Sequence, residues 1–310
     1  MRPLEERLGG TRLLRHGSLR YELLEPLGRG GMGDVHVARV VGGLERRVCI
    51  KRLAGTLAPE QAAALREEAR LLASVRHANV VSLLAFAEDD EVGPFLVLEL
   101  VEGLDLRALS RGLDPDRLAD GVAVHVACAL LRALAAVQRC LPGLVHRDVT
   151  PHNVLVSAHG EVKLGDFGIA LARDRTRWTR PLHVKGKPGY MSPEQIRGEE
   201  LDPRSDLFAV GVVLYELLSG QRPWGPAAGM REMLRTLDEA PMPLARLCPR
   251  LARGLPAVVD RLMARSPDAR FACPEDALRA LGPFGAGELG SLRLASLVRL
   301  VTDAGGHVAT

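Results

Sequence analysis

Residues 146–153 read HRDVTPHN, a short polar loop between apolar segments of the chain. Asp148 and Asn153 stand five positions apart in this loop, and Thr150 lies between them. Asp and Asn are common in turns, so turn formation explains either residue taken alone. A carboxylate held in such a loop can also orient a hydroxyl group and receive its proton, which is the work of a general base.

Asp166 follows in KLGDFGIA at residues 163–170. Together, Asn153 and Asp166 offer the oxygen ligands that Mg²⁺ accepts, since this ion usually takes one or two carboxylates plus phosphate oxygens and water. Three oxygen-bearing residues at these spacings favour one metal-assisted phosphate site over three unrelated turns.

A glycine cluster, GRGGMGDV at residues 28–35, stands between two segments with the pattern of strands. In dinucleotide-binding folds such glycines open a helix, but here DVHVARV follows, which is typical of a strand. A strand–glycine loop–strand hairpin can lay its backbone over phosphates without obstruction by side chains. A plain flexible turn is the alternative for this segment alone.

Lys51 ends the short apolar run RRVCIKRL. An ammonium group beside a triphosphate needs a carboxylate to hold it, and the predicted helix over residues 59–76 offers Glu67 and Glu68. We prefer Glu68, because its spacing from Leu65 and Leu72 puts it on the inward stripe of that helix. Solvated charges at a strand end and on a helix surface are the alternative.

Composition sets limits on the class of protein. The chain has 310 residues, 47% of them hydrophobic, which is enough for a large core in one domain or two lobes. A net charge of +3 gives no reason to expect nucleic acid as a partner. Five cysteines without a C-x-x-C pair, no long apolar run and a charged N-terminus favour a reduced, cytoplasmic protein without membrane insertion.

Changes in composition and in sequence pattern divide the chain into four regions. We expect a charged leader over 1–20, a small strand-rich lobe over 21–101, a larger helical lobe over 102–282 and a glycine-rich tail over 283–310 with one short helix. Helices are predicted over 117–140, 206–219, 229–238, 255–264 and 274–281. The expected class is therefore α+β, with two lobes.

The ordered segments GRGGMGDV, VCIK, HRDVTPHN, DFG and SPE resemble the motif set of eukaryotic-type protein kinases. GMG and GYMSPEQ are most similar to the bacterial serine/threonine members, and the resemblance covers about residues 21–281. It implies a bilobal kinase fold that transfers the γ-phosphate of ATP, with Mg²⁺, to Ser or Thr hydroxyls of protein substrates.

The resemblance also implies a role for each motif residue. Asp148 is expected to be the catalytic base, with Asn153 and Asp166 on Mg²⁺ and Lys51, paired with Glu68, on the ATP phosphates. The expected nucleotide pocket comprises Leu27, Gly28, Gly30, Gly31, Gly33, Val35, Cys49, Lys51, Leu98, Glu99 and Val101. The expected braces of the large lobe are Glu194 with Arg270, and Asp206 beneath the catalytic loop.

Two positions depart from the family pattern. Serine/threonine members usually carry Lys where this chain has Thr150, and Thr where it has Lys187. Those side chains approach each other beside the catalytic Asp in the family fold, so we hypothesise that Lys187 replaces the missing charge at the γ-phosphate. A solvated Lys187 beside a neutral Thr150 is the alternative.

Regulation follows from the same resemblance. Arg147 is expected to meet a phosphate on the loop between Asp166 and Glu194, with Thr176 and Thr179 as sites of autophosphorylation in a transient homodimer. Two rival functions remain open at this point. One is a pseudokinase scaffold, which Thr150 favours. The other is a small-molecule kinase, which would not need a substrate loop ending in GYMSPE.

Overall fold

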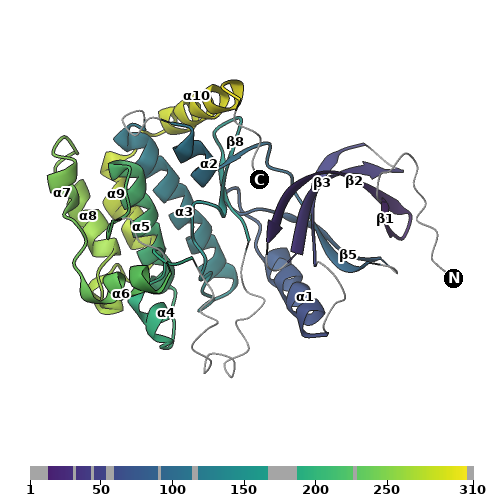
Figure 1. Cartoon of the computed structure of the whole chain (residues 1–310), viewed down its shortest axis with the longest axis horizontal. Helices are drawn as coiled ribbons and strands as arrows, with labels where there is room; N and C mark the ends of the chain where they lie inside the picture. Colours follow the sequence, from purple (N-terminus) through teal and green to yellow (C-terminus); the bar gives the residue numbers. More distant parts are fainter. Residues whose placement is uncertain are drawn as a thin grey trace.

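The chain forms two lobes in a computed structural model, which describes residues 13–30, 33–42, 45–53, 59–89, 92–113, 118–166, 187–225 and 229–305. Figure 1 shows a β-rich lobe at the N-terminal end of the chain and a larger helical lobe beside it. The expected α+β bilobal arrangement is thus the observed one.

A six-stranded antiparallel sheet builds the small lobe, in the order β1-β2-β3-β4-β6-β5. Its strands are β1 Leu13–His16, β2 Leu19–Gly30, β3 Gly33–Val41, β4 Arg47–Arg52, β5 Leu83–Asp89 and β6 Gly93–Leu98. One face holds a small core in which the rings of Tyr21 and Phe95 meet edge-on at 5.7 Å. Helix α1, Pro59–Ser74, contacts β5 and β6.

The alternation of side chains along β4 determines which of its residues face away from the core of the small lobe. Val48 and Ile50 are fully buried in the core of the small lobe. Because side chains alternate along a strand, Cys49 and Lys51 point to the opposite face. Lys51 pairs in register with Val35 of β3 and Leu96 of β6.

The first strand corrects the predicted leader. Residues 13–16 form β1 and pair with β2, and Leu14 is fully buried in the small core. Residues 13–20 therefore belong to the small lobe, whereas residues 1–12 lie outside the described part of the chain. Short, charge-rich LLRH has too few apolar positions to display the period of a strand.

Helices dominate the large lobe, around α3 Asp120–Cys140 and α5 Arg204–Ser219. The other elements are α2 Leu106–Arg111, α4 Pro193–Arg197, α6 Met230–Asp238, α7 Leu244–Leu247, α8 Leu255–Leu262, α9 Pro274–Leu281, the 3₁₀ turns η4 Pro267–Ala269 and η5 Gly282–Phe284, and the sheet of β7 Gly103–Asp105, β8 Val154–Ser157 and β9 Val162–Leu164. Within the described residues, α3 alone is long and apolar enough to cross a membrane, but 78% of that stretch is buried inside the protein. It is therefore the core helix of this lobe.

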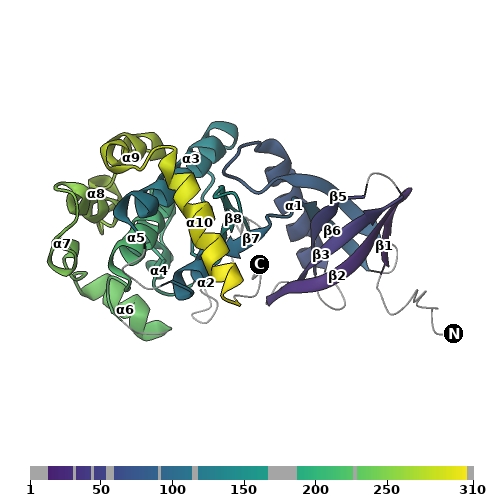
Figure 2. The ribbon, with the colours of Figure 1, turned by 90° about the horizontal axis from the view of Figure 1, so that it is seen from above.

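The C-terminal helix is longer than predicted. Helix α10, Leu289–Asp303, contacts α3, α2 and β8, and Figure 2 shows it lying across the helical lobe. Leu294 and Val298 are buried in the main core. At Gly160, a Cβ atom would come within 1.9 Å of the Ser291 carbonyl oxygen, so the backbone of α10 packs directly on the turn after β8. Most of the predicted tail is thus part of the large lobe.

Candidate active site

A cavity of about 220 Å³ lies between the two lobes, at the end of β4 and beside α1. Its lining is mainly apolar, with a few charged and amide side chains at one side. The lining residues are Leu27, Val35, Cys49, Lys51, Glu68, Leu72, Val81, Leu98, Glu99, Leu100, Val101, His152, Asn153, Leu155, Gly165 and Asp166. An apolar cleft with a few convergent polar groups is the usual form of a small-molecule site.

Lys51 joins both sides of this cavity. Its Nζ lies 2.7 Å from Glu68 Oε1 and also donates to Asp166 Oδ1. Burial alone lowers the pKa of Lys51, but the carboxylates of Glu68 and Asp166 raise it well above its ordinary value. The lysine is therefore a fixed positive charge, held by Glu68 and not by its neighbour Glu67.

The loop of residues 146–153 brings Asp148 and Asn153 together. The amide nitrogen of Asn153 donates to the backbone oxygen and to Oδ2 of Asp148, each at 2.8 Å. The other carboxylate oxygen, Oδ1, is buried and has no hydrogen-bond partner within the described residues. Asp148 is thus oriented through one oxygen, which leaves the second to accept a proton.

Asp206 holds the backbone of this loop in place. Its carboxylate accepts from the backbone N–H of His146 at 2.7 Å and of Arg147 at 2.9 Å. Complete burial raises the pKa of Asp206 to about 7, although these two N–H groups oppose the shift. Arg147 adopts φ 70°, a strained conformation for a residue with a side chain, and Gln195 Nε2 donates to its carbonyl at 3.0 Å. Asp206 and Gln195 thus fix the backbone of this loop through separate hydrogen bonds.

Glu194 and Arg270 meet in a second clamp further inside the large lobe. The guanidinium donates to both carboxylate oxygens, at 2.7 and 2.8 Å. Ser205 Oγ also donates to Glu194, at 2.6 Å. This pair ties the start of α4 to the turn after α8 in the interior of the lobe.

The two exchanged positions differ in their surroundings. Thr150 is 1% exposed, and its Oγ1 has no hydrogen-bond partner within the described part of the chain. The Lys187 side chain is exposed, but the surrounding protein still removes part of the water around its ammonium group, which lowers its pKa. The carboxylates of Asp148 and Asp105 oppose this shift. The ammonium group of Lys187 is therefore in the electrostatic field of Asp148.

The glycine segment forms the hairpin of β2 and β3. At Gly33, with φ 150°, a Cβ atom would come within 1.9 Å of the Arg52 carbonyl oxygen, so this position requires glycine. Gly28 pairs with Val35 and Gly30 with Gly33 across the hairpin. Gly31, Thr176 and Thr179 lie outside the described residues.

Sequence reasoning missed several residues of the site. Leu72 of α1, Val81 just before β5 and Leu155 of β8 line the cavity. The apolar pattern of α1 and of β8 was the available signal for Leu72 and Leu155. The N–H of Glu99 donates to Ser82 O at 3.0 Å, and its side chain accepts from Ser82 N and Lys163 Nζ. Glu99 can therefore meet a ligand in the cavity through its carbonyl, while its N–H is already used.

Asn153 and Asp166 fit the magnesium site expected from the sequence. Since Asn153 directs its amide hydrogens to Asp148, its carbonyl oxygen faces the other way and is suited to a hard cation. The Asp166 side chain is half exposed at the cavity. The described residues contain no group of three or more His, Cys, Asp and Glu side chains that could hold a metal alone. One carboxylate and one amide oxygen fit Mg²⁺ that arrives with phosphate ligands.

A two-lobed fold with a lysine–glutamate pair over the cleft and an Asp–Asn loop below it defines a class of phosphotransferase. Residues 21–278 match the family described as "Protein kinase domain". The chain belongs to this family, as its motifs indicated.

Curated relatives include a probable serine/threonine-protein kinase of Streptomyces coelicolor, 35% identical over 88% of this chain. Serine/threonine-protein kinase PknB of Mycolicibacterium smegmatis is 36% identical over 83% of the chain. The chain spans less than half of each relative's length, 43% and 41%. The crystal structure of the PknI kinase domain of Mycobacterium tuberculosis covers 88% of the chain and 98% of its own, with a TM-score of 0.65 and 23% identity. This likeness supports the fold alone.

Proposed function

We propose that this chain is an active protein kinase that transfers the γ-phosphate of ATP to Ser or Thr hydroxyls of protein substrates, with Mg²⁺. The observation that carries the proposal is the joining of Lys51, Glu68 and Asp166 at a cavity that Asn153 also lines, with Asp148 hydrogen-bonded to Asn153. These groups supply the positioning and charge stabilisation that phosphoryl transfer requires.

The nucleotide occupies the cavity between the lobes in this proposal. The base lies among Leu27, Val35, Cys49 and Leu98 and meets the backbone of Glu99 and Val101. Lys51 binds the α- and β-phosphates and stays charged because of its two carboxylate partners. The β2–β3 hairpin covers the phosphates with backbone.

Asp148 acts on the acceptor. Its unpartnered Oδ1 accepts the proton of the substrate hydroxyl, while Asn153 fixes the other oxygen. Asn153 and Asp166 would hold Mg²⁺, and the bound ion would supply neutralisation of phosphate charge. Lys187 supplies the positive charge at the γ-phosphate that Thr150 lacks, in keeping with its position in the field of Asp148.

Control of activity extends the proposal. We place autophosphorylation at Thr176 and Thr179, in a transient homodimer, with Arg147 as the partner of the phosphate. A cytoplasmic location fits the burial of α3, the long apolar helix of the large lobe. Serine and threonine are favoured as acceptors because the chain lacks the Arg or Ala-rich loop of tyrosine-directed members. The relatives are named as kinases, so they lend no support to a pseudokinase scaffold.

The deciding experiment is an assay with ATP and Mg²⁺ on generic protein acceptors, followed by mass spectrometry of the acceptor and of the enzyme. Transfer that disappears in Asp166→Ala and after chelation of Mg²⁺ supports the proposal. Nucleotide binding without transfer to any acceptor, in the folded wild type, would refute it. Absence of phosphate anywhere in residues 170–190 would refute only the autophosphorylation sites.

A further inference from the structure

The outward face of helix α10 is apolar. Leu289, Leu292 and Leu300 are 58%, 63% and 44% exposed, although they lie on a helix whose other side packs on the main core, where Leu294 is fully buried. At about 100° per residue the three exposed leucines fall within about 80° of one another, with Ser296 at the centre of the stripe. Figure 1 shows α10 along the edge of the large lobe. A narrow apolar stripe thus faces outward from this edge.

A pocket of about 390 Å³ lies beside the stripe, between α10 and the start of α3. Its lining is mainly apolar and consists of Ala119, Val122, Leu289, Leu292, Arg293, Ser296 and Leu297. Because it adjoins exposed leucines, α10 presents a ridge and a hollow side by side. A partner that carries its own apolar ridge can therefore fill the hollow and cover the leucines together.

Four charged residues border the stripe in an order that reads the same from both ends. Glu288 and Asp303 stand at the two ends of α10, and Arg293 and Arg299 lie three positions on either side of Ser296. All four charged side chains are exposed, and none of them forms an ion pair within the described residues. These charges are therefore open to a partner.

A second copy of the same helix, running antiparallel, matches the apolar stripe. If the two helices cross at Ser296, Leu292 of one lies at the same level as Leu300 of the other, because both residues are four positions from the crossing. The small side chain at the crossing lets the helices approach closely. Leu300 of the second copy then lies over the pocket, on the side of Leu289 and Arg293.

The charges favour the same arrangement. In an antiparallel pair, the acidic ends of one helix flank the arginine-bearing middle of the other, and the two helix dipoles run in opposite directions. A partner with charge of one sign, such as an acidic segment or an anionic membrane, would meet Glu288 and Asp303 as well as the two arginines. A self-complementary pattern of this kind is what a two-fold contact between identical chains requires.

We propose that the outward face of α10 is a contact surface between two copies of this chain, packed antiparallel about Ser296 with Leu300 of each copy in the pocket of the other. The contact does not rest on the function proposed above, since the pocket shares no residue with the cavity between the lobes. One helix face buries a small area, so the dimer is weak and transient.

Sedimentation velocity of the full chain, at concentrations up to about 200 μM, is expected to show a dimer whose fraction rises with concentration. Leu292→Glu combined with Leu300→Glu should weaken the dimer at least about tenfold. The matched control, Met230→Glu with Leu234→Glu, alters two apolar side chains of α6 that are 61% and 49% exposed, and it should change nothing. Circular dichroism checks that both variants fold.

Cross-linking tests the antiparallel arrangement independently of those variants. Ser296→Cys should form a disulfide between copies under mild oxidation, because position 296 meets its own counterpart at the crossing. Leu289→Cys should not, since its counterpart lies about 21 Å further along the helix axis and a disulfide needs Cα atoms within about 7 Å. Mass spectrometry of the linked peptides separates this bond from one formed by the exposed Cys140.

Three results would overturn the proposal. The first is a monomer at every concentration, including one that binds phosphatidylglycerol vesicles through the same leucines. The second is a dimer that survives the double change in α10 or is lost in the α6 control. The third is a disulfide at position 289, which indicates parallel helices. A dimer with the expected cross-link but without phosphate transfer leaves the contact standing and refutes only the proposed function.

Discussion

Glu194 and Arg270 form a bidentate ion pair, at 2.7 and 2.8 Å, in which Arg270 has no exposed side-chain surface. Although burial raises the pKa of Glu194, hydrogen bonds from Arg270 and Ser205 outweigh it and lower the pKa from 4.5 to about 2. Three backbone carbonyls, of Ala264, Arg204 and Arg265, also accept from Arg270. The pair is thus fixed from all sides, and its charge state is linked to folding.

The linkage predicts a specific dependence of stability on pH. A carboxyl whose pKa is lower in the folded than in the unfolded chain stabilises the fold above the unfolded value, here 4.5. That contribution, about 3 kcal/mol, is lost as the pH falls through about 2. We expect urea unfolding to show a loss of stability from about pH 5 downward that is smaller in Glu194→Gln.

Glu194→Gln should also be less stable than wild type at neutral pH, by about 3–5 kcal/mol, because it leaves the buried Arg270 without its counter-charge. Glu199→Gln is the control, since Glu199 meets Arg197 at 4.0 Å in an exposed pair. It should cost less than about 1 kcal/mol. Equal losses in the two variants would mean that the buried pair has no special part in stability.

Two adjacent glutamates on α1 give a matched test of the lysine clamp. Glu68 is 4% exposed and bonded to Lys51, whereas Glu67 is half-buried and makes no bond with that lysine. Glu68→Gln is expected to lower kcat/KM for ATP at least about tenfold, since the lysine loses a carboxylate and its fixed position. Glu67→Gln should stay within about twofold. Steady-state kinetics with varied ATP decides, and similar values for the two variants would contradict the clamp.

The exchange of Thr150 and Lys187 leads to a prediction about transfer itself. Removing a positive charge at the γ-phosphate costs about 3 kcal/mol of transition-state stabilisation, so Lys187→Ala should lower kcat about a hundredfold with little change in substrate KM. Lys185→Ala, two positions away in the sequence, is the control and should retain activity. A kcat near that of the wild type in Lys187→Ala would exclude this role.

Restoration gives the same hypothesis a positive test. Introducing Thr150→Lys into the Lys187→Ala variant returns the charge to the position that most serine/threonine members use. We expect partial recovery of kcat, because Thr150 is buried and a longer side chain must displace its neighbours. Single-turnover measurements distinguish recovery of the transfer step from a change in substrate binding.

Elements with a clear period were predictable from the sequence. The apolar stripe of Leu65, Ala69 and Leu72 identified α1 and selected Glu68 over Glu67, and the structure brings that side chain to Lys51. Asp148 and Asn153 are close in the sequence, so their contact required only a compact loop. Local pattern was thus sufficient to choose Glu68 over its neighbour within one helix, and to bring Asp148 to Asn153 within one loop.

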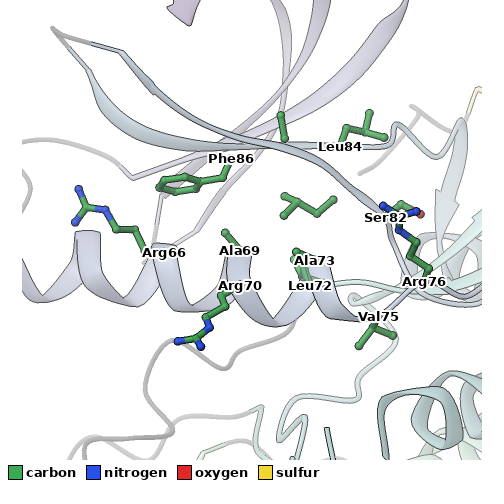
Figure 3. A pocket seen from close by; sticks show the side chains of 12 residues that line it. Arg66, Ala69, Arg70, Leu72, Ala73, Val75, Arg76, Ser82, Leu84 and Phe86 are labelled. Atoms are coloured by element: carbon green, nitrogen blue, oxygen red, sulfur yellow. The ribbon is translucent and has the colours of Figure 1, made fainter. Parts of the chain in front are cut away.

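Features that depend on distant segments were not predictable. β1 is short and charged, and only its pairing with β2 makes it part of the sheet. The ion pair of Arg107 with Glu216, at 2.9 Å, and the bond from Tyr190 Oη to the same carboxylate join three segments far apart in the sequence. The cavity of about 800 Å³ between α1 and β5 likewise forms because Ala69 and Ala73 of the helix carry only a methyl group where they face the strand (Figure 3). The sequence pattern of α1 or of β5, taken alone, does not predict this cavity.

Cys49 offers a chemical test of where the nucleotide lies. Burial raises the pKa of this thiol from 9.0 to about 11, although the charge of Lys51 opposes the shift. The thiolate fraction at a pH below both values is then about a hundredfold lower than for an unperturbed thiol. Iodoacetamide should therefore label Cys49 slowly and the exposed Cys140 first, as followed by mass spectrometry.

ATP should slow labelling of Cys49 further and leave Cys140 unchanged, because Cys49 is the one cysteine that lines the cavity between the lobes. Rapid labelling of Cys49, or labelling indifferent to ATP, would contradict this placement of the nucleotide.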